Sequence, residues 1–215
     1  MKNLNQIVAY FNHEIVNRTT VVFVVLCLAG LGRGATVVLD PGHGGGAPGA
    51  VAANGATEKN LNLAVCRMIR ARLEGVCEVV MTRDADVGVS LAARAGLIRR
   101  VDPDLVVSVH CDGSLNVKAL GQTVYVYPGS SVKTQVAAAL AADSLAAVGS
   151  VDRGVRAERF RVLAVPQPAM LIEMGFLSNV EESAWLQGTG GQRALAGAIA
   201  DAVAHALRVM TYVPR

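Results

Sequence analysis

Short apolar runs alternate with helical patterns from residue 35 to the end of the chain. Six runs in which apolar residues are continuous or alternate with polar ones predict strands: Thr36–Leu39, Cys77–Met81, Leu105–Val109, Thr123–Tyr127, Val162–Val165 and Met170–Ile172. Helical spacing of apolar residues predicts helices at Glu58–Leu73, Leu91–Val101, Val132–Val148 and Leu195–Met210. Strands and helices that alternate in this way are typical of a layered α/β domain.

Residues 1–34 differ in pattern from the rest of the chain. The apolar run Val21–Leu31 follows a more polar stretch and is closed by Gly32-Arg33-Gly34. A membrane-spanning helix needs about 20 apolar residues, so this shorter run fits the apolar region of a signal peptide better. We therefore expect a signal peptide or weak signal anchor at 1–34, one domain at 35–215, and export to the periplasm or cell envelope. A buried strand or helix packed on the domain is the alternative.

Composition narrows the possible classes of protein. Hydrophobic residues make up 52% of the 215 residues and charged residues 17%, which excludes an intrinsically disordered chain. Aromatic residues are only 4% and the net charge is +3, which argues against a nucleic-acid partner. The domain contains Cys66, Cys77 and Cys111 without a CxxC pair, so a zinc ribbon is excluded. We expect these cysteines to be small buried side chains, while a disulfide between Cys66 and Cys77 stays open.

Four ionisable residues stand where predicted elements begin or end. His43 follows the first strand, Glu58 opens the first helix, and His110 and Glu173 each end an apolar strand. Ligands of open α/β sheets bind outside the carboxyl ends of the strands, so three of these four residues should meet in one crevice. Two imidazoles and one carboxylate form a zinc site with an open fourth position. A second carboxylate nearby can act as general base.

Each of these residues also has a purely structural interpretation. The helix dipole alone favours an acid such as Glu58 in a first turn, and His43 and His110 can simply occupy a turn and a strand end. Glu173 is harder to explain, because an ionised carboxylate at the end of a buried strand is costly unless a positive charge faces it. The HGGG run that begins at His43 also occurs in oxyanion loops of α/β-hydrolases, but the chain has no GxSxG. It also lacks the GK[ST] of a P-loop and the HExxH of a zinc protease.

Longer motifs point to one enzyme family. The run VVLDPGHGGGAPGAVAANGATEKNLNLAV, from Val37 to Val65, resembles the zinc-dependent N-acetylmuramoyl-L-alanine amidases of the amidase-3 (AmiC-like) family. Further matching motifs follow in the same order: Thr82-Arg83 with Asp86, Leu91 and Arg94, then LVVSVHCD, then Asp152-Arg153-Gly154-Val155, and then PAMLIEMGFLSN, which ends at Asn179. The resemblance extends from about Thr36 to about Leu207.

This resemblance implies a specific site and reaction. His43, Glu58 and His110 would bind one zinc ion, and Glu173 would be the catalytic carboxylate. The reaction would be hydrolysis of the amide between N-acetylmuramic acid and L-alanine in peptidoglycan, during cell-wall remodelling or lysis. The fold would be a single α/β domain with a twisted, mostly parallel sheet of about six strands and helices on both faces.

The chain departs from the family pattern at a few positions. Ala47 stands where the family usually has an acid, Cys111 follows a ligand histidine where a small residue is common, and Asp112 is a weaker expectation as support for a ligand. Arg83 and Arg94 are expected to be structural rather than catalytic. None of these departures touches the four central residues.

Two other functions remain open on the sequence. Only 62 residues separate His110 from Glu173, and predicted elements use most of them, so we expect no inhibitory helix and a domain that is active without an obligatory protein partner. We also expect a monomer. The alternative is a non-catalytic or partner-activated peptidoglycan-binding module on the same fold. A different metallohydrolase is a third possibility, because a fold does not fix a substrate.

Overall fold

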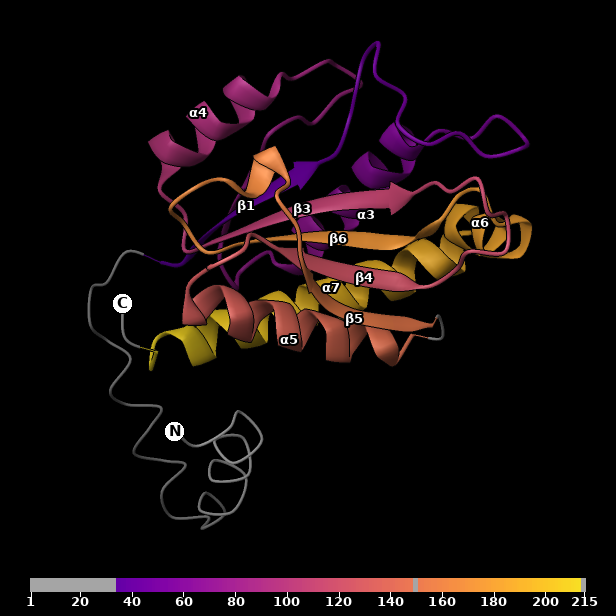
Figure 1. Ribbon diagram of the computed structural model, residues 1–215. Coiled ribbons are helices and arrows are strands. Elements are labelled where there is room, and N and C mark those ends of the chain that lie inside the picture. Colours follow the sequence, from indigo (N-terminus) through magenta and orange to yellow (C-terminus); the bar gives the residue numbers. More distant parts are fainter. Residues whose placement is uncertain (1–33, 149–150, 214–215) are drawn as a thin grey trace. The chain divides into compact units, whose positions relative to one another are not determined.

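A six-stranded sheet forms the centre of the region that the computed structural model describes, residues 34–148 and 151–213 (Figure 1). In chain order its strands are β1 (Thr36–Pro41), β2 (Glu78–Met81), β3 (Leu105–Asp112), β4 (Gln122–Val126), β5 (Asp152–Ala157) and β6 (Ala169–Phe176). The strand order across the sheet is β2-β1-β3-β6-β4-β5. Only the β4–β6 pair is antiparallel among these neighbours. The expected mostly parallel sheet of about six strands is confirmed.

Helices cover both faces of this sheet, as predicted. Three of them lie on one face, where the last packs against the other two: α3 (Glu58–Arg72), α5 (Val132–Ala146) and α7 (Thr189–Met210). The opposite face carries α4 (Leu91–Val101) and the short 3₁₀ turn η1 (Arg161–Leu163), as Figure 1 shows above the sheet. A further helix, α6 (Val180–Gln187), connects β6 to α7.

The two faces of the sheet build two separate apolar cores. Val37 and Leu39 of β1 point into the larger core beneath α3, α5 and α7, whereas Val38 points into the smaller core beside Ile98 of α4. This alternation follows from the period of two in a strand. β3 is buried along Leu105–Val109 on both faces, as its continuous apolar sequence predicts.

Capping residues explain where several helices begin and end. The Ser90 hydroxyl accepts a hydrogen bond from the Ala93 N–H at 3.2 Å, and this bond caps α4. Ser131 caps α5 in the same way through the N–H of Thr134, at 3.3 Å. α4 ends at Val101, and the next residue, Asp102, has a left-handed backbone with a φ of 49° and is followed by Pro103. Local chemistry therefore sets these boundaries.

The predicted strand at Val162–Val165 is wrong. The segment instead forms η1, in which the N–H of Leu163 bonds the carbonyl of Phe160 at 3.0 Å. Both edges of β6 are already paired, with β3 and β4, so no neighbouring edge of that strand was free for it. The sequence pattern also missed β5 and α6, and it placed the start of the last helix at Leu195 rather than Thr189.

The three domain cysteines carry free thiols. Cys66 and Cys111 are buried, and burial raises the pKa of both thiols well above the usual value. The structure thus supports the interpretation of small buried side chains for Cys66 and Cys111, whereas Cys77 is only half-buried, and it shows no Cys66–Cys77 disulfide. The signal-peptide and anchor predictions fall almost wholly on residues 1–33, outside the described residues. No helix in the described part is long and apolar enough to cross a membrane.

Candidate metal centre and active site

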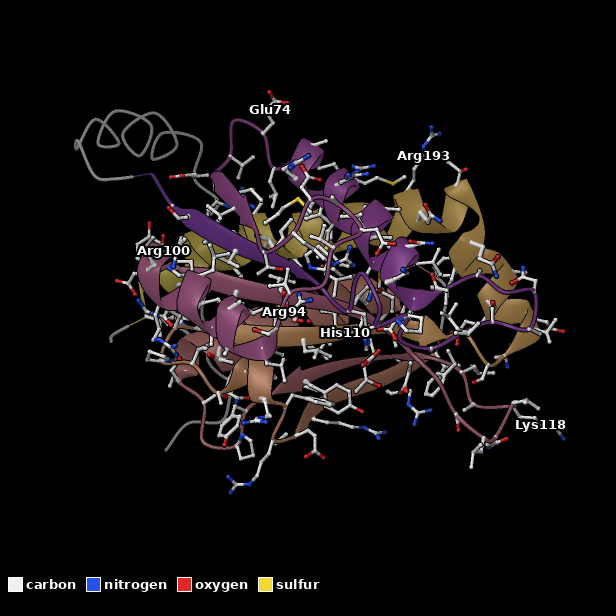
Figure 2. The ribbon with its side chains drawn as sticks, turned by 90° about the horizontal axis from the view of Figure 1, so that it is seen from above. Glu74, Arg94, Arg100, His110, Lys118 and Arg193 are labelled. Atoms are coloured by element: carbon white, nitrogen blue, oxygen red, sulfur yellow. The ribbon has the colours of Figure 1, made fainter. Side chains whose placement is uncertain are left out.

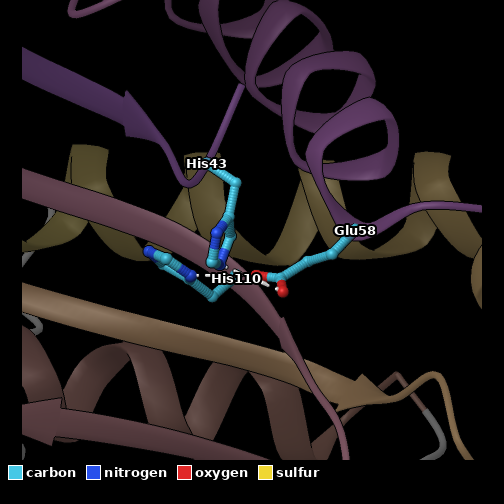
Figure 3. A group of neighbouring side chains, drawn as sticks. All are labelled: His43, Glu58 and His110. Atoms are coloured by element: carbon cyan, nitrogen blue, oxygen red, sulfur yellow. Dashed lines mark hydrogen bonds and ion pairs between the residues drawn. The ribbon is translucent and has the colours of Figure 1, made fainter. Parts of the chain in front are cut away.

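Three residues that are far apart in the sequence meet at the carboxyl end of the sheet. His43 lies in the loop that follows β1, Glu58 is the first residue of α3, and His110 lies near the end of β3 (Figure 3). One potential ligand atom from each lies within 4.8 Å of the others. Of the three candidates at strand ends, His43 and His110 lie in this cluster, and Glu58 at the start of a helix completes it.

Glu58 joins the two histidines. Its Oε2 lies 3.1 Å from Nε2 of His43, and its Oε1 lies 2.9 Å from Nδ1 of His110. The backbone N–H groups of Ala50 and Cys111 donate to the same carboxylate at 2.8 and 3.2 Å. A favourable helix dipole explains an acid at this position, but it does not explain these four contacts. The side chain serves the site rather than the end of the helix.

The ionisation of Glu58 suits a metal ligand. Burial alone would raise its pKa, but hydrogen bonds with His110 and His43, the charge of His110 and the N–H of Ala50 together lower the pKa well below the usual range. The carboxylate is therefore ionised at neutral pH and can only accept hydrogen bonds or bind a cation. Glu58 is 4% exposed, whereas the His43 side chain is 33% exposed, so the group opens to solvent on the His43 side.

Two glycines make room for these side chains. A Cβ atom at Gly42 would lie 2.2 Å from Cε1 of His110, and one at Gly49 would lie 2.3 Å from Oε2 of Glu58. Gly49 also has a φ of +71°, which favours glycine for a second reason. The backbone thus approaches the trio at two points where any other residue would displace a ligand atom.

Glu173 lies on β6, directly opposite His110 in the register of β3 and β6. It belongs to the same sheet face as that histidine but is not one of the three clustered ligands. Its Oε2 is buried and has no hydrogen-bond partner among the described residues. Burial and the negative charges of Glu58 and Asp112 raise the pKa of Glu173 well above its usual range. The strand continues three residues beyond it, so Glu173 does not end the strand as predicted.

Comparisons with known proteins agree with this geometry. Residues 37–205 match the family model described as N-acetylmuramoyl-L-alanine amidase (Amidase_3). The chain belongs to this family. It is an amidase, as the sequence motifs indicated.

Solved structures and curated relatives extend the match. An N-acetylmuramoyl-L-alanine amidase from Clostridium difficile 630 superposes with a TM-score of 0.80 at 30% identity, covering 82% of this chain and 98% of that one. The catalytic domain of CwlV from Bacillus (Paenibacillus) polymyxa gives a TM-score of 0.77 at 31% identity, covering 81% and 99%. The amidase AmiA of Escherichia coli is 28% identical, over 78% of this chain and 74% of its own length.

Two buried arginines hold the loop that carries His43 in the amidase. Arg94 donates from Nη2 to the carbonyl of His43 at 2.7 Å and from Nη1 to that of Pro41 at 2.9 Å, and it also pairs with Asp40. Arg83 donates to the carbonyls of Pro41 and Gly42 at 3.0 and 2.8 Å. The structural role expected for both is confirmed. The sequence did not show that both arginines support the loop that carries His43, a candidate metal ligand. The backbone of His43 has a φ of 60° in this loop.

Replacing Arg94 with methionine should lower the free energy of unfolding by about 3–5 kcal/mol, because Asp40 would keep its buried charge without a charged partner. Urea denaturation followed by circular dichroism measures this loss. Arg100→Met is the matched control, since Arg100 is exposed on the same helix, at its other end (Figure 2). A loss at Arg94 no larger than that at Arg100 would contradict the role of the buried pair.

The remaining departures from the family pattern lie outside the trio. The Cys111 side chain packs into the larger core, on the face opposite to His110, so its thiol is not in the site. Ala47 closes a tight turn through paired backbone bonds with Gly44 at 3.0 and 3.1 Å. Asp112 accepts a bond from the N–H of Gly113 at 2.7 Å, and no contact with His43, Glu58 or His110 supports its expected helper role in the described region.

Proposed function

We propose that the chain hydrolyses the amide between N-acetylmuramic acid and L-alanine in peptidoglycan, with one zinc ion bound by His43, Glu58 and His110. The observation that carries the proposal is the cluster of two imidazole nitrogens and an ionised carboxylate within 4.8 Å. Catalytic zinc sites in proteins use three such ligands and keep one position open. The family match supports the choice of substrate.

The surroundings of the trio also fit a divalent cation. Glu58, Glu173 and Asp112 interact electrostatically, and their mutual repulsion raises the pKa of Glu173 and Asp112 beyond what burial does. Oε2 of Glu173 is buried without a partner among the described residues. A cation bound beside these acids would offset the repulsion and the cost of burying charge.

Bound zinc would polarise the scissile carbonyl and lower the pKa of a water molecule towards neutrality. Glu173 supplies the proton transfer that hydrolysis needs. Its ionised carboxylate accepts a proton from the attacking water as the C–O bond forms, and it returns that proton to the alanine nitrogen as the C–N bond breaks. The N–H groups of Ala50 and Cys111 bond the carboxylate of Glu58, and Gly42 lies close against the ring of His110. These contacts keep both side chains in position at the reacting centre.

The raised pKa of Glu173 predicts a pH dependence. A carboxyl group whose pKa is raised stays protonated to higher pH, and only its ionised form accepts a proton. Burial is the largest cause of this rise and does not depend on the repulsion that a bound cation would offset, so the acidic limb of the kcat profile should lie above the pH at which an ordinary glutamate titrates, about 4.3. Initial rates between pH 4 and pH 9 measure this limb. Finding the same limb in the residual activity of Glu173→Gln would assign it to another group.

One experiment tests the proposed function as a whole. The metal-stripped chain is titrated with zinc against a chromophoric chelator, and each sample then digests purified peptidoglycan, whose products are identified by mass spectrometry. We expect one tightly bound zinc per chain, and release of peptides with a free L-alanine amino terminus that returns with the zinc. New reducing sugar ends, or cuts within the peptide, would exclude this amidase reaction. Binding of zinc and peptidoglycan without any product would favour the non-catalytic or partner-activated module.

We further propose that the site needs no activator and that the chain acts as a monomer. Between His110 and Glu173, the longest described helix is α5, which packs against α7 on the sheet face opposite to His110 and Glu173. α5 therefore does not cover the trio. The substrate lies outside the cytoplasmic membrane, so the function also supports export to the envelope through residues 1–34, with residues 35–215 as the catalytic domain.

A further inference from the structure

The register of the sheet continues the row of site residues outward to β5. Glu173 pairs with His110 on one side and with Thr123 of β4 on the other. Tyr125, two residues along β4, pairs with Arg156 of β5. Residues paired across neighbouring strands point to the same face, so Arg156 lies on the face that carries Glu173. The β4–β5 register shifts between Gln122 and Val124, so Arg153 and Gly154 of β5 both lie beside Thr123.

Arg153 is held in a fixed position with most of its hydrogen-bonding capacity unused. Its guanidinium carbon lies 5.1 Å from the centre of the Phe176 ring, three residues beyond Glu173. Its Nη1 donates to the carbonyl of Leu120 at 3.2 Å. An arginine has five N–H donors. Within the described part of the chain, its guanidinium donates this one hydrogen bond, and its Nε is buried without a partner.

Arg156 is tied to the same place. Its Nε donates to the backbone carbonyl of Arg153 at 3.3 Å, and its side chain is exposed. The nearest acids in sequence are otherwise engaged, because Asp152 and Glu158 accept bonds from the N–H groups of Gly154 and Arg159, both at 2.7 Å. The ion pairs of the described arginines involve three others: Arg67, Arg70 and Arg94.

Asp112 forms an ion pair with neither arginine in the described part of the chain, where its carboxylate accepts a bond from the N–H of Gly113 at 2.7 Å. Arg153 and Arg156 therefore present two positive charges, with spare donors, beside the proposed catalytic carboxylate. The planar guanidinium group of an arginine matches a carboxylate group in geometry as well as in charge.

We propose that Arg153 and Arg156 form a subsite that binds carboxylates of the peptidoglycan stem peptide, and so make the enzyme select acidic stems. The inference rests on the proposed function. Two strand spacings of about 4.8 Å separate β6 from β5, so Arg153 stands about 10 Å from Glu173 along the sheet. An extended peptide covers that span in about three residues. The subsite thus reaches acidic groups near the scissile bond rather than distant cross-links.

Paired ligands test the subsite. Two synthetic stem peptides are used, identical except that their carboxylates are free in one and amidated in the other, and binding to the full-length protein is measured by calorimetry. We expect the free acid to bind at least about tenfold more tightly, and the preference to fall to near unity in Arg153→Gln/Arg156→Gln. The single variant Arg156→Lys, which keeps the positive charge, should retain part of the preference for the free acid. The control Arg100→Gln/Arg193→Gln removes two exposed arginines away from His110 and should keep the full preference (Figure 2).

The same two peptides attached to N-acetylmuramic acid then serve as substrates. The preference should reappear as a lower KM for the acidic substrate, with kcat changed much less. Equal binding of the two peptides by the wild-type protein, or a preference that survives the double substitution, would overturn the subsite. If neither substrate were hydrolysed, the proposed function would fail while the binding result still decided the subsite. If the control variant also lost the preference, general charge attraction would explain it, and the subsite would be rejected.

Discussion

Glu173→Gln should reduce kcat for peptidoglycan hydrolysis by about 10³-fold while the chain stays folded and binds zinc. Glutamine has nearly the same shape as glutamate but cannot take a proton from water, so the general-base contribution is lost. The substitution also removes a buried charge that has no hydrogen-bond partner at Oε2 among the described residues, so the fold should not suffer. Release of dye from labelled peptidoglycan measures the rate, and thermal unfolding reports on the fold.

Glu181→Gln is the matched control for this substitution. Glu181 is exposed in the first turn of α6, eight positions further along the chain, and makes no contact with the trio. Its rate should equal that of the wild type. A Glu173→Gln variant that kept a tenth or more of the wild-type rate, with zinc bound, would show that another group moves the proton.

The convergence of His43, Glu58 and His110 was predictable from the sequence because parallel strands end at one edge. The apolar runs located β1 and β3, and so placed His43 and His110 at the carboxyl edge of the sheet, although β3 extends to Asp112. Glu58 was placed by the helical pattern that begins with it. The rule that ligands gather at carboxyl ends of strands then brought distant residues together without any knowledge of contacts.

The failures have physical causes as well. β5 was not predicted because its sequence, DRGVRA, has no apolar run. Such a strand is stabilised by its backbone bonds to β4 rather than by burial. Val162–Val165 has the apolar composition of a strand, but both edges of the neighbouring strand β6 were occupied. The roles of Arg83 and Arg94 depend on which backbone carbonyls accept their hydrogen bonds, and the sequence pattern does not predict these long-range partners.

These misses bear on the site, because they concern what surrounds the trio rather than the trio itself. Ionisable ligands are recognisable by type and by their position at strand ends. The backbone that orients them is built from glycines and carbonyl groups, whose contacts are long-range. Gly42 is the clearest case: the sequence shows a glycine in a turn, while the structure shows a glycine against an imidazole ring.

Gly42→Ala should weaken zinc binding by at least about 100-fold, and activity should fall with it, although no ionisable group changes. The added Cβ would lie 2.2 Å from Cε1 of His110 and 2.5 Å from both of its ring nitrogens, so the ring must leave its present position. Substitutions that only misorient a ligand already cost about 10–100-fold in metal affinity, and this one displaces the ligand itself. Competition with a chromophoric chelator gives the affinity.

Gly46→Ala separates this steric effect from a general loss of loop flexibility. Gly46 lies four residues after Gly42, at the end of the HGGG run, but a Cβ there has no atom within 4 Å, and neither Gly42 nor Gly46 is among the residues with positive φ. Alanine at either position therefore restricts the unfolded chain similarly, and only at Gly42 does it meet His110. Wild-type zinc affinity in Gly46→Ala with a large loss in Gly42→Ala would locate the effect at the histidine. Equal losses in both variants would instead show that the loop must move for zinc to bind, and unchanged affinity in Gly42→Ala would remove His110 from the ligand set.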